Sequence, residues 1–158
     1  MGIKGKPAPP ALEFAFRVRV QVADPTVIGK LRTGTRRIVE ILDGEFEGPG
    51  LKGRVLPGGA DWQLIGDDGY TVADARYTLQ TDDGHLVYVS NIGMRHAAAD
   101  VMRRLNAGEP VDPSEVYFRT VPKFETDAPG LEWLMNSIFV GTGERYPNGV
   151  VIYFWRVT

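Results

Sequence analysis

Several ionisable side chains interrupt segments that otherwise look like buried β-strands. Arg119 follows Phe118 and precedes Thr120, and Asp61 directly precedes Trp62. A charged group in an apolar environment is costly unless it is paired or solvated. These residues therefore predict either an internal ion-pair network or a polar pocket for a ligand. The guanidinium fork of arginine matches two oxygens of a carboxylate or phosphate, which favours an anionic ligand.

Carboxylates beside aromatic rings are the candidates for acid–base chemistry. Asp61 adjoins Trp62 and Glu125 follows Phe124, and desolvation in such surroundings raises the pKa of a carboxyl group. We therefore expect Asp61 or Glu125 to act as the general base if the protein is an enzyme. The other candidates lie within or beside strand-like segments and are expected to bind the ligand. They are Trp62, Asp74, Arg76, Asn91, Arg95 and Arg119.

Several of these positions also have a purely structural explanation. Asp74 and Arg76 would lie on the solvent face of their strand, because strand side chains alternate between two faces. The inner face of that strand would then carry Ala73, Ala75, Tyr77 and Leu79. Trp62 would belong to the core, and Glu125 would lie on a surface loop. The sequence leaves both explanations open.

Motifs of common enzyme classes are absent from the sequence. There is no G-x-x-x-x-G-K-[ST] phosphate loop, no G-x-G-x-x-G turn and no G-x-S-x-G nucleophile elbow. The chain has no cysteine, and its two histidines, His85 and His96, are too few for an ordinary zinc site. We therefore expect no cofactor and no metal. A metal held by one histidine and carboxylates is the alternative.

Composition indicates a soluble protein with a single domain. Of the 158 residues, 43% are hydrophobic and 24% are charged, and the net charge is −2. Because the basic residues are scattered, we expect no nucleic-acid partner. No apolar run approaches the roughly 18 residues of a membrane helix, so we expect no membrane partner. The absence of cysteine fits a reducing compartment, and a cytoplasmic location is expected.

Alternation of apolar and polar residues predicts the elements that would position these side chains. Residues 12–22 alternate strictly, and turn signals such as Asp82-Asp83-Gly84 recur about every ten to fifteen residues afterwards. Two stretches, residues 97–107 and 127–136, favour short helices.

These elements predict an all-β domain, residues 12–158, that follows a flexible N-terminal arm, residues 1–11. About nine strands with up-and-down connections favour an antiparallel β-barrel with two short helices, since closure removes exposed sheet edges. A two-sheet sandwich is the alternative.

The Pro57-Gly58-Gly59 segment is the strongest irregularity in the strand pattern. Proline fixes one φ angle, and glycine permits conformations that other residues avoid. Such a break inside a sheet is typical of a bulge. We predict a bulged corner of the barrel that aims Asp61 into the interior and Trp62 outward.

The last predicted strand has two apolar faces. Val150 and Ile152 lie on one face, and Tyr153 and Trp155 lie on the other. One face can line the barrel, whereas the other needs a covering layer. Either assembly into a homo-oligomer or coverage within the chain would provide it, and the sequence does not choose between them.

Six motifs together resemble domain-of-unknown-function family 3237, small uncharacterised proteins of the UPF type. In chain order they are G-x-V-L-P-G-G-A-D-W, D-A-R-Y-T-L, N-x-G-x-R, Y-F-R-T-x-P-x-F-E-T, W-L-x-N and I-F-V-G, which begin at residues 53, 74, 91, 117, 133 and 138. The resemblance covers nearly the whole chain and implies an antiparallel barrel with a cavity, but no established reaction. Its polar positions add Trp133 and Asn136 to the ligand-binding candidates.

Two functions from different classes remain open. The first, which we favour, is a β-barrel that binds a small organic ligand, anionic or aromatic, in a polar cavity. The alternative is a cofactor-free isomerase, lyase or cyclase with a carboxylate general base, since such reactions need proton transfer without a nucleophile or metal. A third explanation of the buried charges is a structural ion-pair network.

Overall fold

The computed structural model describes residues 5–158, and its regular structure is dominated by strands. The strands are β1 (Leu12–Val22), β2 (Thr26–Leu31), β3 (Gly34–Gly48), β4 (Leu51–Val55), β5 (Gly59–Ile65), β6 (Thr71–Thr81), β7 (Leu86–His96), β8 (Tyr117–Glu125), β9 (Phe139–Tyr146) and β10 (Gly149–Val157). The helical elements are α1 (Ala99–Asn106) and two 3₁₀ turns, η1 (Pro113–Glu115) and η2 (Glu132–Leu134).

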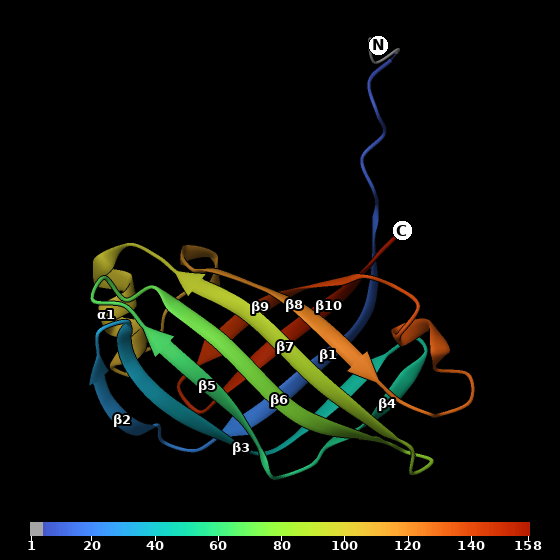
Figure 1. Ribbon diagram of the computed structural model, residues 1–158, viewed down its shortest axis with the longest axis horizontal. Coiled ribbons are helices and arrows are strands. Elements are labelled where there is room, and N and C mark those ends of the chain that lie inside the picture. The colour runs from blue at the N-terminus through green and yellow to red at the C-terminus, as the bar shows by residue number, and fades with distance from the viewer. Residues whose placement is uncertain (1–4) are drawn as a thin grey trace.

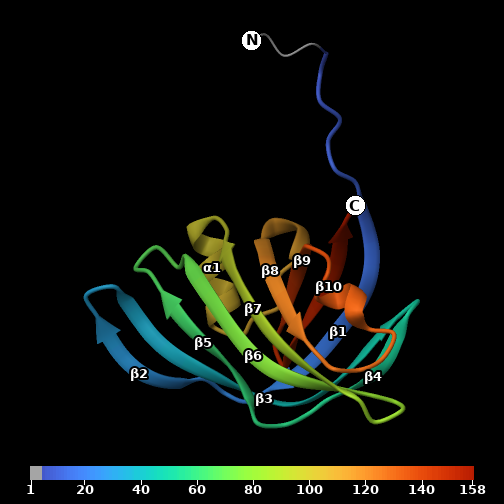
Figure 2. The same ribbon diagram turned by 45° about the vertical axis from the view of Figure 1, so that its right-hand side comes forward.

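The strands close into an antiparallel barrel with 8 strand positions (Figures 1 and 2). β1 pairs with β10 on one side and with β3 on the other, which joins the two ends of the sheet. β10, β9, β8, β7 and β6 follow as successive neighbours. β4 and β5 occupy one strand position, because both pair with β3 and with β6. β2 pairs with the first part of β3, and β1 pairs with the later part. The predicted barrel is confirmed, and the sandwich does not form.

The predicted break at Pro57-Gly58-Gly59 separates β4 from β5. Val55 of β4 pairs with Leu79 of β6, and Ala60 of β5 pairs with Arg76 of β6. Residues 55 and 60 are five positions apart, whereas their partners on β6, residues 79 and 76, are only three positions apart. The extra residues form a bulge, which increases the local bend of the barrel wall.

Glycine is required at two positions of this bulge. Gly58 has a φ of +101°, in the left-handed region that favours glycine. A Cβ atom at Gly59 would lie 2.6 Å from the Cβ atom of Tyr77. Beyond the bulge, Asp61 faces the barrel interior and Trp62 faces outward.

One end of the barrel is filled by packed aromatic side chains. The ring of Phe16 lies 5.1 Å from that of Phe154 and 6.2 Å from that of Phe46, and Phe124 lies 5.2 Å from Phe139. None of these five side chains is more than 4% exposed. Each buried ring contributes on the order of 2–3 kcal/mol. This apolar end stabilises the barrel on which the other end is built.

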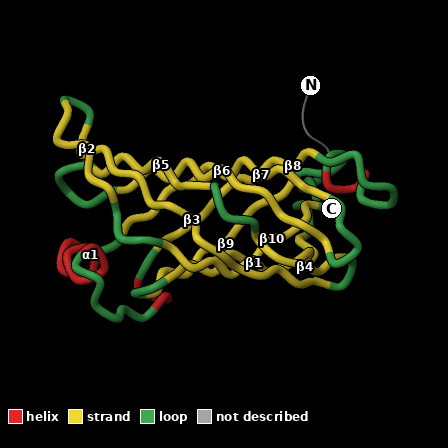
Figure 3. Tube along the Cα trace, turned by 90° about the horizontal axis from the view of Figure 1, so that it is seen from below, coloured by secondary structure: helices red, strands yellow, loops and turns green. Residues whose placement is uncertain are grey.

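Helix α1 lies at the opposite end of the barrel (Figures 1 and 3). It buries Val101, Met102 and Leu105. Met102 packs against the β5–β6 turn so closely that a Cβ atom at Gly69 would lie 2.9 Å from its Cβ atom. The predicted helix over residues 97–107 is confirmed, with both ends shorter than expected.

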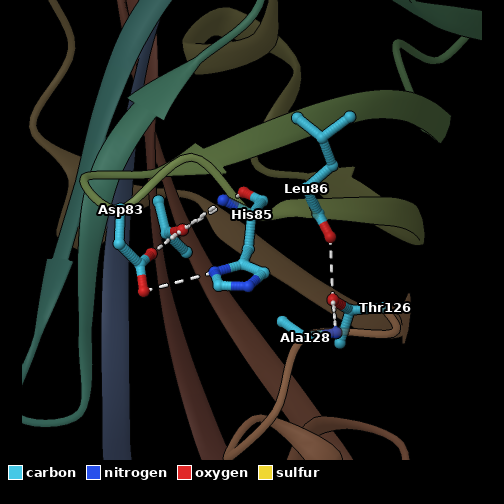
Figure 4. A network of polar contacts seen from close by, with 6 residues as sticks. Asp83, His85, Leu86, Thr126 and Ala128 are labelled. Atoms are coloured by element: carbon cyan, nitrogen blue, oxygen red, sulfur yellow. Dashed lines mark hydrogen bonds and ion pairs between the residues drawn. The ribbon is translucent and has the colours of Figure 1, made fainter.

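The second stretch predicted to be helical, residues 127–136, is helical only in part. Only the short turn η2 forms there, and Gly130 has a φ of +83°, which is incompatible with helix. Thr126 fixes the backbone at the start of this stretch. Its hydroxyl donates to the carbonyl of Leu86 at 2.7 Å and accepts from the N–H of Ala128 at 3.1 Å (Figure 4).

The residue before β1 pairs with the residue after β10. Ala11 and Thr158 exchange two backbone hydrogen bonds of 3.0 Å. Residues 5–10 of the expected arm are exposed and lead away from the barrel (Figure 1), and residues 1–4 lie outside the described part. Within residues 5–158, no helix has the length and apolar character needed to cross a membrane.

The outer face of β10 is partly covered within the chain. The ring of Trp155 packs edge-on against Phe14 at 5.5 Å, and its indole N–H donates to Thr142 at 3.3 Å. Val151 is only 9% exposed. These contacts supply part of the expected covering layer, and assembly into a homo-oligomer stays a prediction.

Candidate functional site

A cavity lies inside the barrel, on the side of the interior nearer α1. The cavity has a volume of about 60 Å³, enough for several water molecules or a small organic group. An aliphatic wall comes from β1, β3 and β10: Val18, Val20, Val22, Val39, Ile41, Val150 and Ile152. A polar wall comes mainly from β5, β7, β8 and β9: Asp61, Gln63, Asn91, Arg95, Thr120 and Arg145.

Asp61 and Gln63 share the inner face of β5, because side chains two residues apart point the same way. Oδ2 of Asp61 accepts from Nε2 of Gln63 at 2.6 Å, and Oδ1 accepts from the backbone N–H of Asp74 at 2.9 Å. Burial raises the pKa of Asp61, although these hydrogen bonds and the charges of Arg95 and Arg37 oppose the shift. The carboxyl group is therefore fixed in orientation, and its charged form is disfavoured.

Arg95 is a buried cation with free donors. Its side chain is 2% exposed, and neither Nε nor Nη2 has a hydrogen-bond partner among the described residues. Its guanidinium lies over the ring of Phe118, 5.6 Å from the centroid. Burial lowers the pKa of Arg95 to about 10, and the like charges of Arg145 and Arg37 add to the effect. An uncompensated buried cation of this kind favours the entry of an anion.

Two further arginines, Arg37 and Arg145, lie in or beside the polar wall of the cavity. Nε of Arg37 donates to Oε1 of Gln63 at 2.7 Å, which connects Arg37, Gln63 and Asp61 in one hydrogen-bonded chain. Arg145 lines the cavity directly. Burial lowers the pKa of both arginines. With Arg95, three guanidinium groups surround one carboxyl group, so the described side chains leave an excess of positive charge.

Two neutral side chains complete the polar wall. Asn91 is 4% exposed and Thr120 is 3% exposed. Oδ1 of Asn91 and Oγ1 of Thr120 are buried without a hydrogen-bond partner in the described chain. Buried polar atoms are normally paired, so these atoms indicate a site for water or for polar groups of a ligand.

Three of the residues predicted from sequence meet at the cavity: Asp61, Asn91 and Arg95. Three others lie on the outer surface, where strand alternation directs them. Trp62 is 38% exposed, and Asp74 forms a surface ion pair of 3.5 Å with Arg76. The structural explanation of Asp74 and Arg76 is therefore the one that the fold adopts.

The remaining four predicted residues also lie outside the cavity. Arg119 and Glu125 are exposed on β8, because the alternate residues of that strand face inward. Trp133 and Asn136 belong to η2 and the segment after it, at the apolar end of the barrel. Cavity geometry gives none of these four residues a ligand contact, and their roles stay untested predictions.

Sequence reasoning missed other cavity residues that the fold brings in. They are Gln63, Tyr77, Thr120 and Arg145, and Arg37 is connected to them through its hydrogen bond to Gln63. Gln63 could have been found, since it lies two residues after Asp61 on the same strand. Tyr77 shares the inner face of β6 with Ala73 and Ala75. Arg145 had no comparable signal, because the inner positions before it on β9 are glycines.

His85 takes part in the β6–β7 turn. Its Nδ1 lies 3.2 Å from Oδ2 of Asp83, and Oγ1 of Thr81 donates to Oδ1 of Asp83 at 2.5 Å (Figure 4). The bonds from Thr81 and His85 lower the pKa of Asp83. Residues 5–158 contain no cluster of three or more His, Cys, Asp or Glu side chains suited to a metal ion. The histidine–carboxylate contact here holds a turn.

The barrel and its cavity can be set beside known proteins. A family described as "Protein of unknown function (DUF3237)" matches residues 10–157. The chain belongs to this family. The resemblance drawn from the six sequence motifs is thereby confirmed.

Other DUF3237-like proteins share both sequence and fold. A UPF0311 protein of Rhodopseudomonas palustris is 46% identical over 145 residues, which cover 90% of this chain and 95% of that protein. The crystal structure of a conserved protein of unknown function from the same species has a TM-score of 0.94 at 42% identity, and covers 96% of this chain and 100% of that one. A β-barrel-like protein from Acinetobacter baumannii has a TM-score of 0.85 at 37% identity, with 98% and 100% covered.

The chain is also similar, more distantly, to proteins of a fungus. A hydroalkoxylation enzyme of Penicillium herquei is 31% identical over 85 residues, 54% of this chain and 56% of that enzyme. The crystal structure of an enzyme from the same species has a TM-score of 0.73 at 22% identity and covers 99% of this chain and 100% of that one. At that identity the structural likeness shows a shared fold alone.

Proposed function

We propose that this DUF3237 protein binds a small organic anion in the polar end of its barrel. The observation that carries the proposal is Arg95, a buried guanidinium with two free donors beside a cavity. Arg37 and Arg145 add positive charge, and Asp61 is the single carboxyl group among the described cavity-lining residues. An anion would supply the missing partner, and the aliphatic wall would hold the organic part of the ligand.

The proposal is tested by calorimetric titration of the purified protein with matched acids and amides. Benzoate, phenylacetate and cyclohexanecarboxylate are each compared with the corresponding neutral amide. At 100 times its dissociation constant a bound acid stabilises the folded state by about 2.7 kcal/mol, which thermal unfolding detects independently. We expect binding of acids and not of amides. Equal behaviour of acids and amides, or no binding of any acid, would refute the proposal.

A second candidate function is proton-transfer catalysis by Asp61. Its carboxyl group lines the cavity, and burial moves its pKa upward, toward the range in which a general base works. The fungal relative is named for hydroalkoxylation, the addition of an O–H bond across a carbon–carbon double bond. Such an addition moves one proton from oxygen to carbon and consumes no redox cofactor. An enzyme of this kind would belong with the isomerase, lyase or cyclase that the sequence left open as the alternative.

Hydrogen–deuterium exchange tests this second function without a known substrate. Phenylpyruvate carries a carboxylate and an exchangeable C–H bond next to its carbonyl group, and NMR in D₂O follows the loss of the proton. We expect the protein to accelerate exchange and Asp61→Asn to slow it at least about tenfold. Glu125→Gln is the control, since Glu125 is exposed on β8. An unaccelerated exchange, or full activity of Asp61→Asn, would exclude Asp61 as a base for this probe.

A further inference from the structure

One complete edge of the Arg95 guanidinium group has no hydrogen-bond partner in the described chain, and the side chain lines the cavity. Nε and Nη2 lie on the same side of the group, and both are buried and unpartnered in the described chain. Cζ of the group lies over the ring of Phe118, 5.6 Å from the centroid. A guanidinium group with a free Nε–Nη2 edge can form two parallel hydrogen bonds to a planar carboxylate.

The neighbouring polar group narrows the ligand further. Asn91 directs a buried, unpartnered acceptor, Oδ1, at this part of the barrel. A carboxylate, phosphate or sulfate offers only further acceptors at neutral pH and cannot satisfy this oxygen. A ligand that pairs directly with this oxygen needs a hydrogen-bond donor, such as a hydroxyl group, apart from its acidic group.

The distance between Asn91 and Arg95 on β7 sets how far apart the donor group and the acidic group of the ligand lie. Asn91 and Arg95 lie on one face four residues apart, so their Cα atoms are about 13 Å apart along the strand. Between them lies Gly93, which pairs with Thr120 of β8. A Cβ atom at Gly93 would lie 2.5 Å from Cγ2 of Thr120. The glycine thus leaves room between Asn91 and Arg95 for the Thr120 side chain.

The opposite wall determines the body of the ligand. Val20, Val150 and Ile152 from β1 and β10 present only hydrocarbon to the cavity. Burying an apolar group against them is favourable, whereas a second charge there would lose its hydration without a partner.

We infer that the ligand is a hydroxy-substituted carboxylic acid with an apolar body. Arg95 holds the carboxylate through both of its free donors, and Asn91 accepts the hydroxyl proton. This inference rests on the proposed anion site and specifies the chemistry of its ligand. It names Arg95 and Asn91 as the residues that determine specificity.

The test is a titration of the wild-type protein with three pairs of acids of increasing length. The pairs are 4-hydroxybenzoate and benzoate, 4-hydroxyphenylacetate and phenylacetate, and 3-(4-hydroxyphenyl)propionate and 3-phenylpropionate. For the pair that fits the cavity, we expect the hydroxyl group to tighten binding at least about tenfold. The methyl ester of that hydroxy acid and phenylphosphonate should bind more weakly than the acid itself.

Two variants assign the roles of the residues. Asn91→Leu has a similar volume without polar atoms, so it should weaken binding of the hydroxy acid far more than binding of the plain acid and erase the preference for the hydroxyl group. Arg95→Lys keeps the charge but loses the fork, so it should weaken both acids at least about tenfold. Arg119→Lys, on the outer surface of β8, is the matched control and should bind like the wild type. Urea unfolding of each variant verifies that it is folded.

The outcomes separate the inference from the proposal beneath it. Equal binding of the paired acids, tighter binding of phenylphosphonate, or wild-type behaviour of Arg95→Lys would refute the inference while anion binding stands. An Asn91→Leu variant that binds both acids equally more weakly would also refute the inference. If neither phenylphosphonate nor any of the six acids binds, the proposed function itself is refuted.

Discussion

Replacing Arg95 by methionine should stabilise the unliganded protein while it abolishes anion binding. Methionine is unbranched and of similar reach, but it carries neither charge nor hydrogen-bond donors. In the free protein Arg95 is buried, and no salt bridge in the described chain joins it to a carboxylate. A residue kept for a ligand commonly lowers the stability of the empty site.

The magnitude follows from the pKa of Arg95. Burial and the charges of Arg145 and Arg37 lower this pKa from 12.5 to about 10. A difference of about 2.5 corresponds to about 3 kcal/mol of preference against the charged form. Because the folded-state pKa is the lower one, the full penalty is present at pH 7 and is relieved only as the pH rises through about 10.

Lost contacts reduce the expected gain. The cation–π contact with Phe118 contributes about 1 kcal/mol in the wild type. We therefore expect Arg95→Met to raise the free energy of unfolding by about 2 kcal/mol, or the melting temperature by about 4–8 °C.

The assay is urea unfolding followed by tryptophan fluorescence, with both proteins first refolded from denaturant and dialysed to remove bound anions. A higher midpoint at unchanged slope indicates a true gain in stability. Lys123→Met on the outer surface of β8 is the control and should change stability by less than about 0.5 kcal/mol. If Arg95→Met instead loses about 1 kcal/mol or more, the guanidinium is compensated within the fold. The cavity would then hold the structural ion-pair network that the sequence left open.

Two further predictions concern Asp61 and the glycines of β9. Because burial raises the pKa of Asp61 above its ordinary 3.8, stability should fall as the pH rises between the two values, since the folded state retains a proton that the unfolded state releases. Asp61→Asn should remove that part of the slope in urea midpoints measured from about pH 4 to about pH 7. Gly143→Ala should cost about 1–3 kcal/mol, because its Cβ atom would collide with the ring of Phe118. Gly50→Ala, whose Cβ atom meets only Trp133 at 3.9 Å, should be nearly neutral in the same unfolding assay.

The strands that sequence predicted well are those with one buried face. β1 was predicted over residues 12–22 and forms over Leu12–Val22, because its alternation reflects burial of one side. β2 lacks a buried face. Five of its six residues are exposed, so no alternation marks it, and only pairing with β3 makes it a strand. A strand of this kind is defined by its neighbour rather than by its own residues.

Sequence by itself determined the class of this protein and the place of its bulge. Alternation, turn residues and the Pro57-Gly58-Gly59 break are local, and they predicted an antiparallel barrel with Asp61 beside a corner. Tertiary structure alone decided which charged side chains meet. Arg37, Arg95 and Arg145 come from β3, β7 and β9 and converge only when the barrel closes. Whether a strand residue faces inward depends on register and bulges set by non-local pairing, so Arg95 entered the cavity while Arg119 and Glu125 turned to solvent.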